Sequence, residues 1–262
     1  MAKVNLDLPI KGSFGNVSIY MLNGKMVLRN KGGASATRIK NEPEFAKLRK
    51  QMSRFGGCST TAKMIRDAMP SIKPLAHPAF HGDLVNLCTS VMDLNPVNPA
   101  DGKKSIIFSY GLPLLQGFAM NVENTFDAVI TTPVGCQLNR EQHSAIVQLP
   151  PLLPGKNFRI PWTYPYYRLR VNLGIIRDMV FDGLAYVPVT PDLKEYSEKY
   201  DTDWWHVRDT FPSTEISLQL QNPVFDENCY LMVTIGVEFG VQKNGEISNV
   251  KHAGCGKILT VQ

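Results

Sequence analysis

The sequence predicts a mainly β protein with an α segment (α+β), in which an antiparallel immunoglobulin-like β-sandwich is preceded by a β-hairpin and two to three helices. Three observations support this class. Apolar residues recur at every second position in short stretches of residues 105–261, helical spacing is confined to residues 41–92, and the turn signal Asn23-Gly24 lies between two alternating runs. With 262 residues, the chain is long enough to bury a sizeable core.

The N-terminal hairpin is predicted from residues 17–29. Apolar side chains alternate with others in residues 17–21 and again in residues 26–29, on either side of Asn23-Gly24. Asn and Gly both tolerate a positive φ, which the turn of a two-residue hairpin loop requires. One face of this hairpin is therefore expected to be buried, and the other to be available to a partner.

The first helix is predicted to begin after Asn41 and to end at Gly56-Gly57. Glu44 lies three residues after Asn41 and can return the capping hydrogen bond, while Pro43 suits the first turn. Four large apolar residues then share one stripe at helical spacing, namely Phe45, Leu48, Met52 and Phe55. This stripe, flanked by Lys and Arg, is typical of an amphipathic helix.

Two more helices are expected before a linker. One is capped by Ser59 or Thr60 and ends before Pro70, and the other spans Phe80–Met92.

The turn residues of Asn95–Pro99, followed by Asp101-Gly102, form the clearest linker in the chain. We expect it to separate a basic hairpin-plus-helices unit, residues 1–100, from a β-sandwich body, residues 101–262.

The body is predicted to consist of about eight short strands. The stretch 190–212 is polar and is expected to be an insertion that is partly helical at best, and Asn244-Gly245 signals another hairpin turn. The expected strands are Ser105–Tyr110, Thr125–Ile130, Ser144–Leu149, Arg168–Leu173, Gly183–Val187, Glu215–Gln221, Tyr230–Val241 and Lys257–Val261.

Charge is divided unevenly along the chain. Residues 1–80 carry 14 Lys and Arg against 4 Asp and Glu, whereas residues 81–262 carry 14 against 19. Such a division is typical of an interaction surface attached to a fold. The sequence contains no GxSxG, HExxH or Walker-type motif. It therefore predicts no enzyme, no catalytic residues and no cofactor.

The residues that could bind metal or form disulfides are scattered. His77 and His81 have the i,i+4 spacing of a helical metal site, but Pro78 lies between them and no Glu or Cys completes a ligand set nearby. The acidic runs Asp192–Glu198 and Asp201–Asp203 are interspersed with Lys and Tyr, so we expect a solvated loop and no metal site.

The five cysteines are far apart and are expected to be free thiols. A disulfide between Cys229 and Cys255 is conceivable only outside the cell.

The leading functional hypothesis is a non-enzymatic structural or adaptor protein that acts through protein–protein contact and self-assembles, as a component of a filament, a shell or a phage-type particle. Its partner would be another copy of itself or another protein. The residues expected to contact a partner are Tyr20, Lys25, Arg29, Lys47, Arg49, Lys50, Arg54, Trp204 and Trp205.

Two other classes of function stay open. In the first, the basic helix of Asn41–Phe55 binds nucleic acid through its Lys and Arg side chains, and Tyr20 stacks on a base. In the second, the sandwich binds a sugar ring on Trp162, Trp204 or Trp205.

No apolar run is long enough to span a membrane, and no classical signal peptide is recognised at the start of the sequence. We expect synthesis in the cytoplasm, with the final location left open between the cytoplasm and an assembled or extracellular particle.

Residues 12–69 contain a distinctive set of residues, namely Gly12, Gly15, Tyr20, Gly24-Lys25, Arg29, Pro43, Phe45, Arg49 and Phe55. This pattern resembles the start of an uncharacterised family of proteins from Bacteroidota, of roughly 200–260 residues. Phe108–Pro113 and Val237–Ser248 are similar to a strand and to the final hairpin of that family. The chain departs from the pattern at Arg54, where the family usually has Glu. The resemblance implies a fold type and no catalytic residues.

Overall fold

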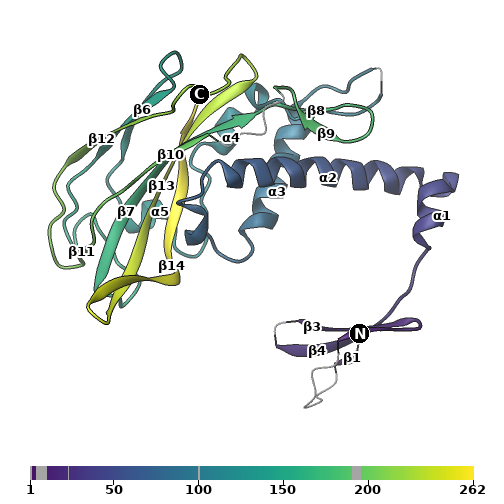
Figure 1. Cartoon of the computed structure of the whole chain (residues 1–262), viewed down its shortest axis with the longest axis horizontal. Helices are drawn as coiled ribbons and strands as arrows, with labels where there is room; N and C mark the ends of the chain where they lie inside the picture. Colours follow the sequence, from purple (N-terminus) through teal and green to yellow (C-terminus); the bar gives the residue numbers. More distant parts are fainter. Residues whose placement is uncertain (1, 4–10, 23, 100, 191–195) are drawn as a thin grey trace. The chain divides into compact units, whose positions relative to one another are not determined.

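The computed structural model describes residues 2–3, 11–22, 24–99, 101–190 and 196–262 (Figure 1). The chain divides into two compact units, Met1–Met52 and Ser53–Gln262. Both contain antiparallel sheets, and helices make up a smaller part of the chain, which confirms the predicted α+β class. The expected division into residues 1–100 and residues 101–262 stays a prediction.

The N-terminal unit contains a four-stranded antiparallel sheet in the order β1-β4-β3-β2. The predicted hairpin is confirmed, with Tyr20 of β3 opposite Val27 of β4. The expectation of one buried face is wrong, because the buried residues Met26 and Val27 are consecutive and lie on opposite faces of the sheet. Among the described residues of this unit, only Met26 and Val27 are buried. The strands are β1 (Ala2–Lys3), β2 (Gly12–Phe14), β3 (Val17–Leu22) and β4 (Lys25–Asn30).

The predicted start of the first helix is wrong. A separate short helix, α1 (Ala36–Asn41), precedes it and is capped by Ser35, whose Oγ accepts from the backbone N–H of Arg38 at 3.3 Å. Asn41 is thus the last residue of a helix and not an N-cap. A 3₁₀ turn (Pro43–Phe45) follows, and α2 (Ala46–Asp67) begins directly after it.

The predicted end at Gly56-Gly57 is also wrong, because α2 continues through both glycines to Asp67. Gly57 is buried against the ring of Tyr186, and a Cβ on Gly57 would lie 2.5 Å from that ring. The glycine therefore permits close packing inside a continuous helix. The third predicted helix is confirmed as α3 (Phe80–Leu94).

The body is formed by two sheets that pack face to face, with helices on the second face of the larger one (Figure 1). The larger sheet has the order β10-β7-β13-β14, with β11 also paired to β7, and the smaller has the order β12-β6-β5. The remaining strands, β8 and β9, form a separate hairpin. The strands are β5 (Gly135–Asn139), β6 (Ser144–Leu149), β7 (Tyr166–Arg177), β8 (Met179–Phe181), β9 (Tyr186–Pro188), β10 (Ser197–Asp201), β11 (Trp205–His206), β12 (Thr214–Gln219), β13 (Cys229–Lys243) and β14 (Glu246–Val261).

The core between the two sheets follows the period of two. Val171 and Leu173 of β7 and Val233 of β13 face Val147 of β6, as alternation predicts for strands with one face turned inward. This arrangement agrees with the predicted β-sandwich. The second face of β13 and β14, with Met232 and Ile258, packs instead against the helices.

Two segments that were predicted to be strands contain helical turns instead. Thr125–Ile130 contains α5 (Phe126–Val129), because the Thr125 hydroxyl caps the N–H of Ala128. Ser105–Tyr110 contains a 3₁₀ turn at Phe108–Tyr110, whose first N–H donates to a side chain instead of joining a ladder. The only other short helix in the described part of the body, apart from 3₁₀ turns, is α4 (Leu112–Leu115).

The stretch 190–212 is also different from the prediction. Its described part holds β10 and β11, which pair with β7, so it extends the larger sheet. The predicted acidic run Asp192–Glu198 lies partly outside the described residues.

The chain that follows α2 packs against glycines on one face of the larger sheet. A Cβ on Gly174 would lie 2.0 Å from the carbonyl oxygen of Ala68, and one on Gly236 would lie 2.5 Å from Leu75. Asn172 strengthens the same contact, because its Nδ2 donates to the Ala68 carbonyl at 2.8 Å. The missing side chains thus allow backbone to pack directly on the sheet.

The edge of β14 is covered near its C-terminal end. Met120 N–H donates to the carbonyl of Gly256 at 2.8 Å, and Ile258 exchanges hydrogen bonds with Gly117 and Phe118. In the described part of the chain, no helix is long and apolar enough to cross a membrane.

Candidate functional site

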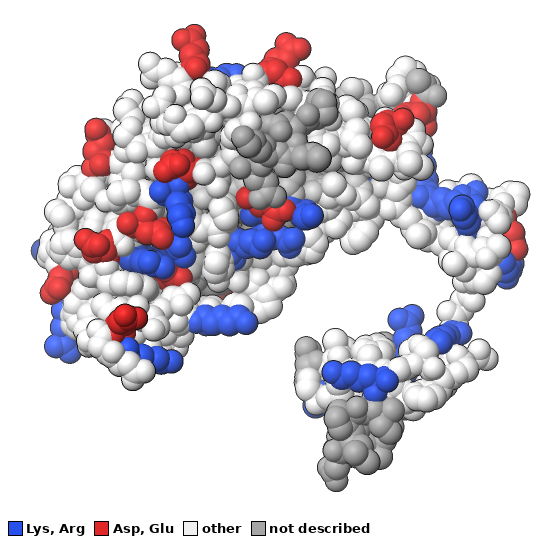
Figure 2. Space-filling view, in the orientation of Figure 1, with Lys and Arg blue, Asp and Glu red and all other residues white. Residues whose placement is uncertain are grey.

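The N-terminal unit combines a small buried core with a high positive charge. Residues 1–52 contain 10 Lys and Arg against 3 Asp and Glu, whereas residues 53–262 contain 18 against 20. Figure 2 shows Lys and Arg, and no Asp or Glu, among the coloured atoms of its sheet on the visible face. Positive charge is therefore concentrated on a unit that buries little of its own apolar surface.

Large apolar side chains are exposed on this unit. Phe14 and Leu22 of the sheet are 60% and 52% exposed, and Met52 of α2 is 56% exposed. Leu48, and Phe55 in the part of α2 that belongs to the second unit, are exposed as well, so the stripe expected on an amphipathic helix faces solvent over most of its length. Several large apolar side chains exposed beside charged ones are typical of a protein-interaction site.

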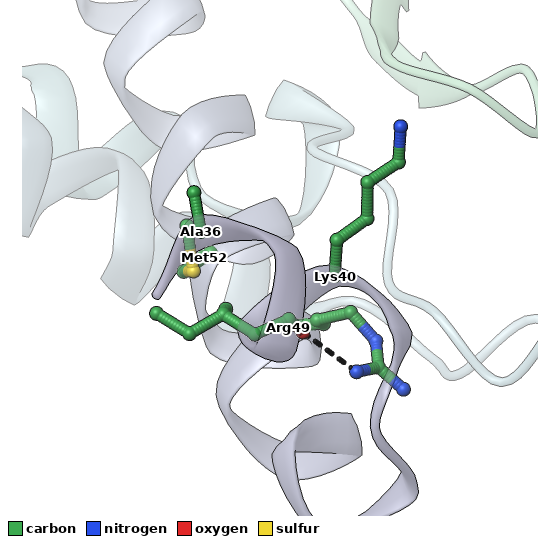
Figure 3. A pocket seen from close by; sticks show the side chains of 5 residues that line it. Ala36, Lys40, Arg49 and Met52 are labelled. Atoms are coloured by element: carbon green, nitrogen blue, oxygen red, sulfur yellow. Dashed lines mark hydrogen bonds between the residues drawn. The ribbon is translucent and has the colours of Figure 1, made fainter. Parts of the chain in front are cut away.

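A hollow of about 370 Å³ lies between α1 and the start of α2 (Figure 3). Its floor is apolar and its two polar side chains are cationic. Figure 3 shows the head groups of Lys40 and Arg49 on one side and Ala36 and Met52 on the other. The lining residues are Ala36, Ile39, Lys40, Arg49 and Met52.

Arg49 fixes the shape of this hollow. Its Nη1 donates to the backbone carbonyls of Ile39 and Glu42 at 2.7 and 2.8 Å. These carbonyls lie at the C-terminal end of α1, where a cation also interacts favourably with the helix dipole. Arg49 therefore ties the end of α1 to α2.

The acidic residues beside the hollow are engaged with Arg38. Its guanidinium contacts Glu42 at 2.7 Å and Glu44 at 2.9 Å, and the hydrogen bond from Arg38 lowers the pKa of Glu42. The single guanidinium offsets one of these two negative charges, while Lys40 stays exposed.

The structure separates the cations that the sequence grouped together. Lys47 and Lys50 are exposed on α2, whereas Arg54 pairs with Asp93 at 2.5 Å. On the sheet, Lys25 and Arg29 are exposed at opposite ends of β4. Tyr20 is half-buried on β3.

The tryptophans make their ring contacts inside the body. The Arg168 guanidinium stacks on Trp204 at 4.6 Å, and Trp205 meets Phe211 at 5.3 Å. Trp162 packs on Phe239 at 4.9 Å. All three are half-buried, so less of each ring face is available to a sugar than the sequence suggested.

A charged cluster lies on the outer part of the larger sheet. Glu238, 1% exposed, accepts from Arg168 at 2.6 Å, from Arg170 at 3.4 Å and from Asn249 at 3.1 Å. Arg170 also binds both oxygens of Asp201 at 2.9 Å. Two cations and two anions balance one another, which is the arrangement of a structural ion-pair network.

Asp178 is a buried carboxylate with structural partners. It accepts from the N–H of Phe108 at 2.7 Å and from the hydroxyl of Tyr230 at 3.3 Å. Burial raises its pKa to about 6, against an ordinary value of 3.8.

We expect Asp178→Asn to remove a pH dependence of stability. The folded wild type holds a proton on Asp178 up to about pH 6, whereas the unfolded chain loses it near pH 4. Stability from this group is therefore greatest at low pH and declines as pH rises between these values. The variant should match wild type near pH 3 and exceed it by about 2 kcal/mol at pH 7, measured by denaturant unfolding. A difference independent of pH would contradict this assignment.

The histidines and cysteines do not converge. His77 contacts the Met120 carbonyl and Asp83, whereas His81 contacts Arg66. Among the described residues, no three His, Cys, Asp or Glu side chains come together as metal ligands.

All five cysteines are free thiols. Burial raises the pKa of Cys136 to about 11 and also raises the pKa of Cys88 and Cys255, which disfavours the reactive thiolate.

The chain matches no protein-family model, and neither a curated protein nor a solved structure shows significant similarity to it. Membership of the Bacteroidota family stays a prediction.

Proposed function

We propose that this protein is a non-enzymatic, self-assembling structural protein that acts through protein–protein contact. The observation that carries the proposal is the N-terminal unit, in which Met26 and Val27 are the only buried residues among those described, while large apolar side chains are exposed. A small sheet without a covered hydrophobic face is at best marginally stable in water. A partner that covers this unit would supply the missing burial.

Burial of these side chains would contribute part of the binding energy. Full burial of an exposed Phe, Leu or Met side chain contributes about 2 kcal/mol, and Phe14, Leu22 and Met52 are 52–60% exposed, so covering all three would contribute about 3 kcal/mol towards the cost of ordering an interface. The concentration of Lys and Arg adds attraction to an anionic partner surface and makes association sensitive to salt.

Light scattering of the full chain tests this proposal. We expect species larger than the monomer at about 0.05 M salt and smaller ones at about 1 M, because screening shortens the range of charge attraction. Lys25→Glu with Arg29→Glu should reduce assembly at low salt. The control carries the same charge change on the body, at the exposed residues Lys156 and Lys251, and should assemble as wild type does. A monomer at every salt concentration would refute the proposal.

The exposed cations Lys25, Arg29, Lys47 and Lys50 favour nucleic-acid binding as the second candidate. Phosphate contacts would make the affinity fall linearly with the logarithm of salt concentration. If Lys47→Glu with Lys50→Glu left an electrophoretic shift unchanged, this candidate would be rejected.

A further inference from the structure

The hairpin of β8 and β9 presents an unusual apolar side chain. Leu184 lies in its loop and is 91% exposed. Scattered exposed leucines are ordinary on protein surfaces, but Leu184 is almost fully exposed and lies in a loop with several internal hydrogen bonds.

The loop around Leu184 is fixed by its own hydrogen bonds. Asp182 Oδ1 accepts from the N–H groups of Leu184 and Ala185 at 2.8 and 2.7 Å. The N–H of Asp182 donates to the Ala185 carbonyl at 3.0 Å, which closes the loop. The hairpin is anchored in turn by Tyr186, whose hydroxyl donates to the Lys104 carbonyl at 3.0 Å. The backbone around Leu184 therefore has little conformational entropy left to lose when it meets a partner.

The same loop carries the carboxylate of Asp182. The backbone N–H groups of Ala185 and Leu184 lower the pKa of Asp182, so it is ionised at neutral pH. The tip therefore offers one apolar side chain with a negative charge two residues away.

The hollow of the N-terminal unit offers the complementary set. Its floor is formed by Ala36, Ile39 and Met52, and its cationic head groups belong to Lys40 and Arg49. Leucine matches the apolar floor, and the Asp182 carboxylate matches the cations on one side of the hollow (Figure 3).

We propose that the hollow binds Leu184 of a second copy of this chain, with Asp182 of that copy beside Lys40 and Arg49. This inference rests on the proposed function and names the surfaces that make the contact. Two different surfaces meet, so the contact is heterologous, and repetition gives a ring if it closes or a filament if it does not.

Cysteine crosslinking between two tagged chains tests the contact. One chain carries Leu184→Cys and the other carries Met52→Cys, and a mild oxidant is added to the mixture. We expect a covalent heterodimer, absent when Val224→Cys, which is 48% exposed, replaces Leu184→Cys. Failure to crosslink would overturn the proposal. So would a crosslink formed only within one chain that carries both substitutions, since the occupant would then be the same copy.

Substitution of Leu184 separates this inference from the proposed function. Leu184→Asp would place a charge against the apolar floor and should weaken association about tenfold or more, whereas Leu184→Met should retain it. Because Leu184 is exposed, both variants should melt as wild type does. If wild type assembles and Leu184→Asp assembles equally well, the docking site is wrong while the proposed function stands. A wild type that never assembles overturns both.

Discussion

Replacement of Gly174 by alanine is expected to lower the free energy of unfolding by about 3 kcal/mol or more, because the new methyl group has no room. Its Cβ would lie 2.0 Å from the Ala68 carbonyl oxygen, which is backbone and cannot rotate aside as a side chain can. The chain after α2 would have to move away from the sheet. That movement would also break the hydrogen bond from Asn172 to Ala68, now 2.8 Å.

Gly135→Ala is the matched control for this prediction. Gly135 also lies in a strand, but the nearest atom to a Cβ there is the side-chain oxygen of Gln148 at 3.3 Å, on an exposed and flexible side chain. Its variant should stay within about 1 kcal/mol of wild type in urea unfolding. Equal losses for the two variants would show that glycine itself, and not the close approach, decides stability.

Removal of the charge on Glu238 should have the next largest effect. Glu238→Gln keeps the size of the side chain but leaves Arg168 and Arg170 without their shared anion. Breaking one partner of a buried ion pair costs about 3–5 kcal/mol, and partial exposure of the arginines, 23% and 11%, reduces the expected loss to about 2–3 kcal/mol. Chemical denaturation measures this loss directly.

Asp93→Asn provides the comparison. It removes the partner of Arg54, in a pair whose side chains are 40% and 52% exposed. Exposed pairs contribute little, so the expected loss is below about 1 kcal/mol. If Glu238→Gln proved as mild as Asp93→Asn, the cluster on the larger sheet would not be a stabilising network.

Local patterns predicted much of the fold. Strict alternation in Ser144–Leu149 identified β6 with its observed bounds, and Asn244-Gly245 identified the turn between β13 and β14. These elements were predictable because one face is buried and the turn chemistry is local. Capping at Thr125 was also local, but its apolar neighbours in Thr125–Ile130 imitate a strand, so the prediction there was wrong.

Tertiary contacts account for the other errors. The pair Gly56-Gly57 is typical of a helix end. The reason for glycine inside this helix is the contact of Gly57 with Tyr186, which is remote in the sequence and so gives no local signal. The strand β10 has five residues with little alternation, and it is set by pairing with β7.

For the candidate site, the sequence located the basic unit but treated its cations alike. Only the structure shows that Arg49 binds backbone carbonyls and that Arg54 binds Asp93. The hollow beside Arg49 and the exposed Leu184 were missed altogether, since a single leucine in a loop carries no periodic signal.

The segment of residues 117–120 has a consequence for how copies of this protein can meet. Bare strand edges recruit strands from other molecules and seed aggregates, a risk that grows when many copies are crowded together. Gly256 and Ile258 already give their outward-facing backbone groups to Met120, Phe118 and Gly117. At this stretch of β14, a strand from a neighbouring molecule therefore cannot pair with the sheet. Contacts between copies here must be made by side chains, whose identity can change during evolution.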